Sequence, residues 1–159
     1  KPETCQFAAS RLVADEHLLY IGRGLDYALS MEGSLKLKEI SYIHSESYAA
    51  GELKHGTISL ITEDMPVIAV ATQRDVLDKT VSNIKEVKSR GAFTIVVTRE
   101  GTDFDKDVAD ILVTVPETDD LLMPMTAVVP LQLIAYYTAD LRGNDVDKPR
   151  NLAKSVTVE

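Results

Sequence analysis

The sequence predicts an α/β protein built on a parallel β-sheet with helices on both faces. Short apolar segments that read as strands alternate along the chain with longer segments of helical period. One of them, residues 67–71 (VIAVA), is a continuous apolar run of the kind that parallel strands show when both faces are buried. Glycine and proline stand at the ends of several segments, where they stop or open an element. We expect ligands at the carboxyl ends of the strands of such a sheet.

The elements of the first half of the chain follow from local patterns. Residues 3–14 carry a helical period and lead into the apolar run 17–21 (HLLYI), which stops at a glycine and therefore reads as a strand and a turn. A long helix is predicted over residues 25–43. Residues 44–48 are predicted as a short strand, and residues 49–61 as a short helix that runs into a loop.

The second half repeats the alternation. A proline opens the strand at residues 67–71, and residues 76–90 form a helix that stops at a glycine. Strands follow at residues 93–97 and 110–115, the second closed by a proline. Residues 126–142 form a long, mostly apolar helix with a glycine just past its end.

Length and composition indicate one domain and exclude several classes of function. The chain has 159 residues, 45% of them hydrophobic and 26% charged, as in ordinary soluble domains. Its net charge of −8 and pI near 4.9 oppose nucleic-acid binding. No apolar run reaches the length of a membrane span and no signal-peptide pattern precedes the domain, so we expect a cytoplasmic protein. We assign residues 1–143 to the domain and the polar residues 144–159 to a C-terminal tail. The chain begins at Lys1 without a methionine, which suggests a fragment.

The predicted helix at residues 25–43 carries the charges that fit a plain structural role least. At about 100° per residue its apolar residues spread over a wide arc. Glu32, Lys36 and Glu39 fall near the middle of that arc, on the face expected to turn toward the interior. The remaining polar strip is narrow and consists of Ser30, Ser34, Lys38 and Ser41. We therefore expect the three charged side chains to be largely buried at one rim of the sheet.

Two interpretations of this charged triple remain open. Glu32 and Lys36 are four residues apart, and Lys36 and Glu39 three apart, so the three can form an ion ladder along the helix. Such ladders usually lie on solvated faces, whereas the angular argument places this one inside. Ionised groups are costly to desolvate unless they pair or line a polar cavity, which favours a functional site containing Lys36 and Glu39. On this interpretation Ser30, Ser34 and Lys38 stay in solvent.

The glycines after the first strand are a candidate phosphate loop. Gly22-Arg23-Gly24 follows a strand and opens a helix, which is the right context for binding an anion on free backbone N–H groups. The third glycine of a dinucleotide motif is replaced by Tyr27, so nucleotide binding is not favoured and the glycines can serve only to turn the chain.

Three further polar residues invite a metal or acid–base interpretation. His44, Glu46 and His55 match no metal-ligand spacing, and we expect neither a metal nor a cofactor. His55 lies at the expected end of a short helix. It can either cap the helix carbonyls or act as a general acid or base, and its residue type alone favours the cap.

Several long motifs resemble one enzyme family. They are residues 32–44 (EGSLKLKEISYIH), Glu46, residues 48–56 (YAAGELKHG) and residues 145–159 (DVDKPRNLAKSVTVE). The chain resembles the C-terminal part of the isomerase region of glutamine:fructose-6-phosphate aminotransferase, over essentially its whole length. The resemblance implies a sugar isomerase (SIS) domain, the second of two in that family. It also implies a three-layer αβα sandwich with a five-stranded parallel sheet of order 2-1-3-4-5, in which residues 44–48 are the short edge strand.

The resemblance also implies roles for individual residues. Glu39 matches the glutamate that moves a proton between C1 and C2 of the sugar, and Lys36 the lysine that assists at the same carbons. Lys154 matches the lysine that forms a Schiff base with the open-chain sugar, with Ala153 beside it in the substrate site. His55 matches the ring-opening histidine, which acts in the active site of the neighbouring subunit. The tail of residues 144–159 then closes over the active site.

The implied activity is the conversion of fructose-6-phosphate to glucosamine-6-phosphate with ammonia from glutamine, carried out by a homodimer. The glutaminase domain and the first SIS domain of the family are absent from this chain. Residues 71–75 (ATQRD), in the turn after the third strand, have one hydroxyl and no glycine, unlike a serine-rich phosphate loop. The alternative is a non-catalytic regulatory SIS module that binds a sugar phosphate. Such a module needs neither Glu39 nor Lys154.

Overall fold

Five parallel strands form a sheet of order β2-β1-β3-β4-β5 in the part of the chain that the computed structural model describes, residues 2–102, 104, 105 and 107–152. All of the neighbouring strands pair in parallel. The expected order is therefore confirmed, and β2 is an edge strand. The strands are β1 (His17–Gly22), β2 (His44–Ala49), β3 (Pro66–Ala71), β4 (Phe93–Arg99) and β5 (Ile111–Val115).

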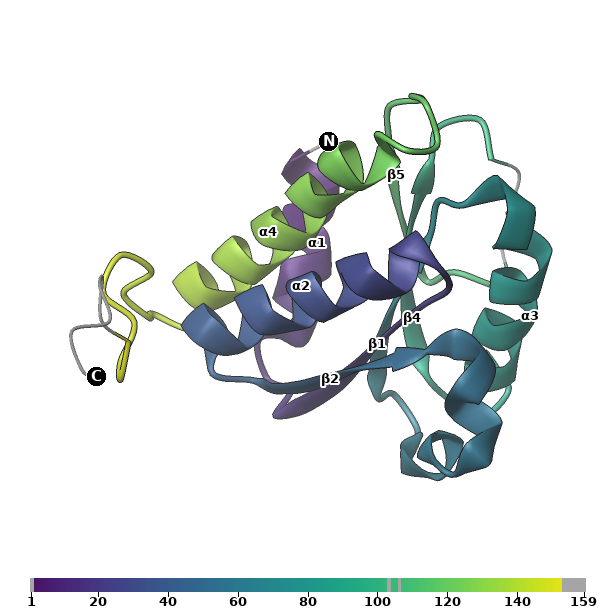
Figure 1. The fold of residues 1–159 in the computed structure, drawn as a ribbon. Coiled ribbons are helices and arrows are strands. Elements are labelled where there is room, and N and C mark those ends of the chain that lie inside the picture. The colour runs from purple at the N-terminus through teal and green to yellow at the C-terminus, as the bar shows by residue number, and fades with distance from the viewer. Residues whose placement is uncertain (1, 103, 106, 153–159) are drawn as a thin grey trace, which may run out of the picture.

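Helices cover both faces of this sheet and complete the three layers (Figure 1). The α-helices are α1 (Pro2–Leu12), α2 (Leu25–Ser41), α3 (Leu77–Lys88) and α4 (Met123–Leu141). Helices α1, α2 and α4 pack together on one face, and α3 lies on the other. The helix expected over residues 49–61 is instead two 3-10 helices, η1 (Ala50–His55) and η2 (Thr57–Leu60), and a third, η3 (Arg74–Val76), precedes α3.

Two apolar clusters, one on each side of the sheet, form the core. The first joins α1, α2 and α4 to the sheet through residues such as Tyr20, Leu37 and Leu131. The second joins α3 and η1 to the opposite face through residues such as Leu53 and Ile84. Every residue of the central strand β3 is buried, because this strand has a neighbour on each side and a helical layer on each face.

The structure corrects the predicted orientation of α2. Its serines face inward and are fully buried, whereas Met31 and Leu35 are exposed. Gly33 lies on the same inward face, where an added Cβ would meet the Tyr20 ring at 2.9 Å and Leu131 at 3.0 Å. Small side chains let α2 approach the sheet and α4 closely, and this close packing outweighs the burial of the larger apolar residues.

The buried serines are tolerated because their hydroxyls are paired. Ser30 donates to the Asp26 and Ile21 carbonyls at 2.8 and 3.1 Å. Ser34 and Ser45 of β2 share a hydrogen bond of 2.9 Å, and Ser41 donates to the Leu37 carbonyl at 2.7 Å. Burying a hydroxyl costs little free energy when it has a hydrogen-bond partner. The polar serines of α2 therefore do not identify its solvent-exposed face. Only Lys38 of the three side chains expected in solvent is exposed.

Helix α2 connects the two rims of the sheet. It begins three residues after β1 ends, at the carboxyl rim, and it ends three residues before β2 begins, at the amino rim. The two ends of α2 therefore lie at opposite rims of the sheet (Figure 1).

Candidate active site

The charged triple lies on an outer flank of the second half of α2. Lys36 Nζ is 2.9 Å from Glu39 Oε2 and 3.7 Å from Glu32 Oε1. The three side chains are half-buried, with exposures of 41% for Glu32, 36% for Lys36 and 30% for Glu39. The expectation of low exposure is therefore wrong, because the serine face rather than this flank packs on the sheet. The triple is also nearer the amino rim than the carboxyl rim at which we expected ligands.

The pairing sets the charge state of the triple. The hydrogen bond that Lys36 donates to Glu39 raises the pKa of the lysine. Burial opposes this rise, and the negative charges of Glu39 and Glu32 add to it. Lys36 is thus held as a cation beside a carboxylate. Only one of the two Glu39 oxygens takes part in this hydrogen bond, and both side chains keep a solvent-facing part that a ligand can reach.

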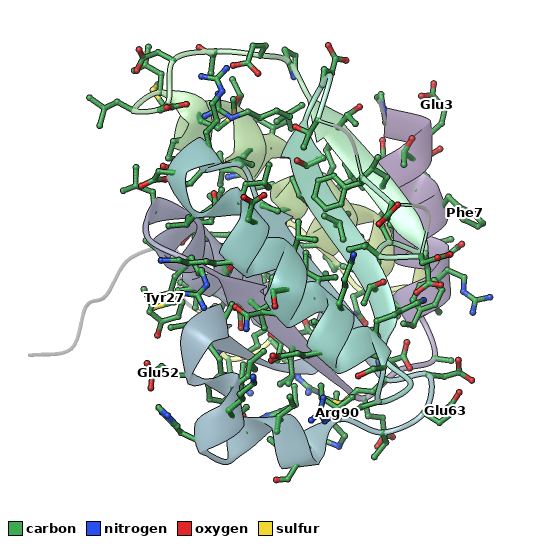
Figure 2. The ribbon with its side chains drawn as sticks, turned by 90° about the vertical axis from the view of Figure 1, so that its right-hand side faces the viewer. Glu3, Phe7, Tyr27, Glu52, Glu63 and Arg90 are labelled. Carbon is green, nitrogen blue, oxygen red and sulfur yellow. The ribbon has the colours of Figure 1, made fainter. Side chains whose placement is uncertain are left out.

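His55 lies far from the triple within one chain. It ends η1, which follows the carboxyl end of β2, whereas Glu39 precedes the amino end of the same strand. Six residues of strand separate the two, a distance of roughly 17–20 Å. The His55 side chain is 75% exposed, and its Nδ1 lies 2.7 Å from Oε2 of Glu52, which projects from the surface (Figure 2). The imidazole thus contacts a carboxylate rather than capping the helix carbonyls.

Ala153 and Lys154 lie outside the described residues, but the tail that leads to them does not. Asn144 Nδ2 donates to the carbonyls of Ile40 and Ser41 at 3.0 and 3.2 Å. Arg150 donates its backbone N–H to the Tyr42 hydroxyl at 3.0 Å, and its guanidinium lies 4.0 Å from the centre of the Tyr42 ring. The tail therefore returns to the end of α2 that carries Glu39.

A different polar cluster occupies the carboxyl rim. Asp26, in the first turn of α2, is fully buried and accepts three hydrogen bonds from the turn after β3. The donors are the Thr72 N–H at 2.7 Å, the Thr72 hydroxyl at 2.5 Å and the Gln73 N–H at 3.0 Å. Burial raises the Asp26 pKa, while these hydrogen bonds and the charge of Arg99 oppose the rise. The N–H groups that a bound anion would use are thus occupied by the chain's own carboxylate.

Arg99 extends this cluster across the rim. It is 3% exposed and donates to the Thr72 carbonyl at 2.5 Å, to Glu117 at 2.7 Å and to Asp120. Arg74 pairs with the same two carboxylates from the surface. The adjoining cavity, of about 340 Å³, is lined by both arginines and Glu117. Charges of both signs meet here, so the cluster is internally neutralised.

The glycine motif after β1 acts as a turn. A Cβ at Gly22 would lie 2.5 Å from the Asp26 backbone, and Gly24 has a φ of +56°, which favours glycine. Arg23 between them donates to Asn83 of α3 at 3.0 Å. These contacts explain the motif without a phosphate ligand.

The amino rim holds a larger cavity, of about 650 Å³, between the starts of β1, β2 and β3. It is lined by His17, His44 and Glu46 together with acidic and apolar residues of the neighbouring loops. Within the described ranges, no group of three or more His, Cys, Asp and Glu side chains is arranged to hold a metal ion. No helix in these ranges has the length and apolar character needed to cross a membrane.

The sequence did not identify the residues whose hydrogen-bond partners lie far away along the chain. Asp26 and Arg99 carry charges at positions where an exposed charge is ordinary. Tyr42 lies in the motif of residues 32–44 but was given no role there, and Asn144 lies outside the motifs. The partners of these four residues are 46, 27, 108 and 104 residues away in the sequence, respectively. The one local signal was the acidic residue in the first turn of α2, a common feature of helix N-termini.

Comparison with known proteins places the chain in a family. The SIS domain family matches residues 11–141. Curated relatives include the glutamine–fructose-6-phosphate aminotransferases [isomerizing] of Clostridium acetobutylicum and Caldanaerobacter subterraneus subsp. tengcongensis. The first is 55% identical over 159 residues, which are 100% of this chain and 26% of that protein. The second is 57% identical over 157 residues, which are 99% of this chain and 26% of that protein. The chain thus spans about a quarter of the length of these relatives.

Solved structures agree. The C-terminal domain of glucosamine-fructose-6-phosphate aminotransferase from Francisella tularensis superposes with a TM-score of 0.85 at 39% identity, over 93% of this chain and 42% of that one. A glucosamine-6-phosphate deaminase from Thermotoga maritima has a TM-score of 0.71 at 24% identity, over 98% and 46% of the two chains. At that identity the likeness concerns the fold alone.

Proposed function

The chain belongs to the SIS domain family, and we propose that it is the second sugar isomerase domain of a glutamine–fructose-6-phosphate aminotransferase. In that enzyme it contributes the isomerisation that turns the imine of fructose-6-phosphate into glucosamine-6-phosphate. One observation carries the proposal: the Lys36–Glu39 pair, at 2.9 Å, lies half-exposed on α2 at the end to which the C-terminal tail returns.

Glu39 supplies the proton transfer. In a ketose imine, C1 carries the proton that must leave and C2 is the carbon that must receive it, so one carboxylate placed beside both carbons takes the proton and returns it. Lys36, held protonated by its carboxylate neighbours, donates to the imine nitrogen, on which charge develops as the C1 proton leaves, and recovers a proton from the C1 hydroxyl as the aldehyde forms. Glu32 supports Lys36 from one turn away.

The tail supplies the covalent step. The Lys154 amine condenses with the C2 carbonyl of the open-chain sugar, which releases water and forms a Schiff base; ammonia then displaces the lysine to give the ketose imine, and Ala153 is a further substrate-binding residue. Lys154 follows Arg150 by four residues, a length that spans at most about 14 Å of extended chain. The contact of Arg150 with Tyr42, three residues after Glu39, therefore supports a common site for the two groups.

His55 opens the sugar ring in the site of a neighbouring subunit. Its position at the opposite end of β2 from Glu39 supports action between chains, because one chain cannot bring both groups to the same sugar. The active assembly is then a homodimer in which each site takes His55 from the partner. The phosphate grip and the ammonia come from the first SIS and glutaminase regions of the longer protein.

A regulatory module that binds a sugar phosphate at the carboxyl rim is not favoured. The N–H groups of Thr72 and Gln73 are already held by Asp26, and Arg99 is already paired. A sensor also has no use for a protonated lysine beside a carboxylate at the other rim.

The test uses the full-length aminotransferase that carries this domain. Glu39→Gln keeps the size of the side chain but removes the base, so glucosamine-6-phosphate formation should fall at least ~10²-fold while glutamine hydrolysis continues. Glu3→Gln, on the exposed side of α1, is the matched control and should change neither rate (Figure 2). An unchanged isomerisation rate in Glu39→Gln would remove the proposed role.

Co-expression extends the test to His55. Random pairing of His55→Ala and Glu39→Gln chains gives heterodimers in which one of two sites has both native groups. Roughly a quarter of the native activity should return, although each parent is inactive alone. No recovery in proven heterodimers would assign both groups to one chain.

A further inference from the structure

Tyr42, directly after α2, has a backbone conformation that its residue type disfavours. Its φ and ψ are 64° and 14°, in the left-handed region. The other described non-glycine residues with positive φ are Asp64 and Asn151, types that tolerate this region. Glycine is the usual residue at such a helix end, and a bulky side chain there is strained. Strain that persists in a folded protein calls for a compensating contact.

The compensating contacts of Tyr42 are with the C-terminal tail. Its hydroxyl accepts the backbone N–H of Arg150 at 3.0 Å. Its ring lies 4.0 Å below the Arg150 guanidinium, within the range of a cation–π contact. A glycine at position 42 would satisfy the backbone and make neither contact.

A second fastening holds the other end of the same segment. Asn144 donates its side-chain amide to the carbonyls of Ile40 and Ser41, two of the carbonyls that a helix leaves without partners at its end. The segment between Asn144 and Arg150 is thus fixed at both ends to the last turn of α2. It follows directly on α4, which packs beside α2.

We propose that Tyr42 and Asn144 are positioning residues that fasten the C-terminal segment to the end of α2. Fastened in this way, the segment of residues 144–150 presents the tail to the proposed site from a fixed point near Glu39. The catalytic consequence rests on the function proposed above, whereas the fastening itself is independent of it.

Hydrogen exchange of this chain, resolved by residue in NMR spectra, tests the fastening. Tyr42→Phe keeps the ring but removes the acceptor, so the Arg150 amide should exchange about fivefold faster, as expected for one lost hydrogen bond. Tyr42→Gly removes both contacts and should accelerate exchange further. Its thermal midpoint should stay close to that of the native chain, because relief of the left-handed backbone offsets the lost packing. Tyr136→Phe, which alters an exposed ring on α4, is the matched control.

Asn144→Ala is the second variant. It should accelerate exchange in the segment that follows position 144 while the Tyr42 contacts persist. Native exchange rates at Arg150 in Tyr42→Gly would overturn the fastening by Tyr42, and native rates after position 144 in Asn144→Ala would overturn that by Asn144.

Steady-state kinetics of the full-length enzyme test the catalytic consequence. Tyr42→Gly should lower kcat for amino-sugar formation about tenfold and leave KM for the sugar phosphate and the rate of glutamine hydrolysis unchanged. Tyr42→Phe should fall between this variant and the native enzyme. An unchanged kcat beside faster exchange would overturn the positioning role and leave the proposed function standing. If the native full-length enzyme made no amino sugar, the proposed function and the positioning role would both be overturned. The hydrogen-exchange rates would still test whether Tyr42 and Asn144 fasten the segment.

Discussion

The two ends of helix α2 carry charge in opposite ways. At the carboxyl rim, Asp26 is fully buried and its carboxylate accepts three hydrogen bonds. Toward the amino rim, Lys36 and Glu39 are about one-third exposed and pair mainly with each other. One helix therefore supplies a closed cluster at one rim of the sheet and an open one at the other.

The difference separates structural from functional charge. A buried carboxylate whose partners are all protein groups has no capacity for a ligand, and its removal leaves those partners unpaired. A half-exposed pair keeps part of its surface for another molecule and contributes little to folding, because water screens it. Substitutions at the two ends should therefore affect stability and activity in opposite proportions.

The largest effect on stability is expected at the closed end. Asp26→Ala leaves two buried N–H groups and a hydroxyl without an acceptor and should lower the free energy of unfolding by about 3 kcal/mol. Urea unfolding followed by circular dichroism measures the change. Asp140→Ala, an exposed aspartate near the end of α4, should stay within about 0.5 kcal/mol of the native chain. A cost below about 1 kcal/mol for Asp26→Ala would erase the contrast between the two ends.

The pH dependence of stability should sharpen the contrast. Burial raises the Asp26 pKa above its usual value of 3.8, so over the interval above 3.8 the folded state binds a proton that the unfolded state has released. The contribution of Asp26 is therefore complete below pH 3.8 and declines as the pH rises through the folded pKa. The unfolding free energies of the native chain and of Asp26→Asn are compared from pH 3.5 upward. The stability of the native chain relative to Asp26→Asn should decrease as the pH rises. A constant difference would mean an unshifted pKa.

The smallest effect is expected at the open end. Lys36→Met removes the central charge of the ladder, yet the unfolding free energy should change by no more than about 0.5 kcal/mol, because the pair is partly exposed. Added salt screens the remaining attraction between Lys36 and the two glutamates. Because that attraction is already weak, the same measurement in high salt should give nearly the same small difference. A loss above about 1 kcal/mol would place Lys36 with Asp26 among the structural charges.

Much of the fold could be predicted because its signals are local. In the described part of the chain, apolar runs and helical periods located four of the five strands and the four α-helices, with ends misplaced by a few residues, whereas the polar residues 44–48 (HSESY) of β2 form no apolar run. The region of η1 and η2 was predicted as one helix, since a 3-10 helix and a short α-helix share the same local pattern. The orientation of α2 was predicted wrongly, because hydrophobicity ranks Met31 and Leu35 above serine for burial and takes no account of how closely a helix must approach its sheet.

The sequence by itself determined the order of the elements through local patterns, and it indicated the family and the candidate groups Lys36, Glu39, His55 and Lys154 through long motifs that resemble a known family. Only the tertiary structure decided which rim of the sheet Lys36, Glu39 and His55 lie nearest and which of the described charges already have partners. Asp26 meets Thr72, Arg99 meets Glu117 and Tyr42 meets Arg150 across 46, 18 and 108 residues. Such contacts depend on the packing of α2 against the sheet and α4, a property of the whole fold that no local pattern encodes.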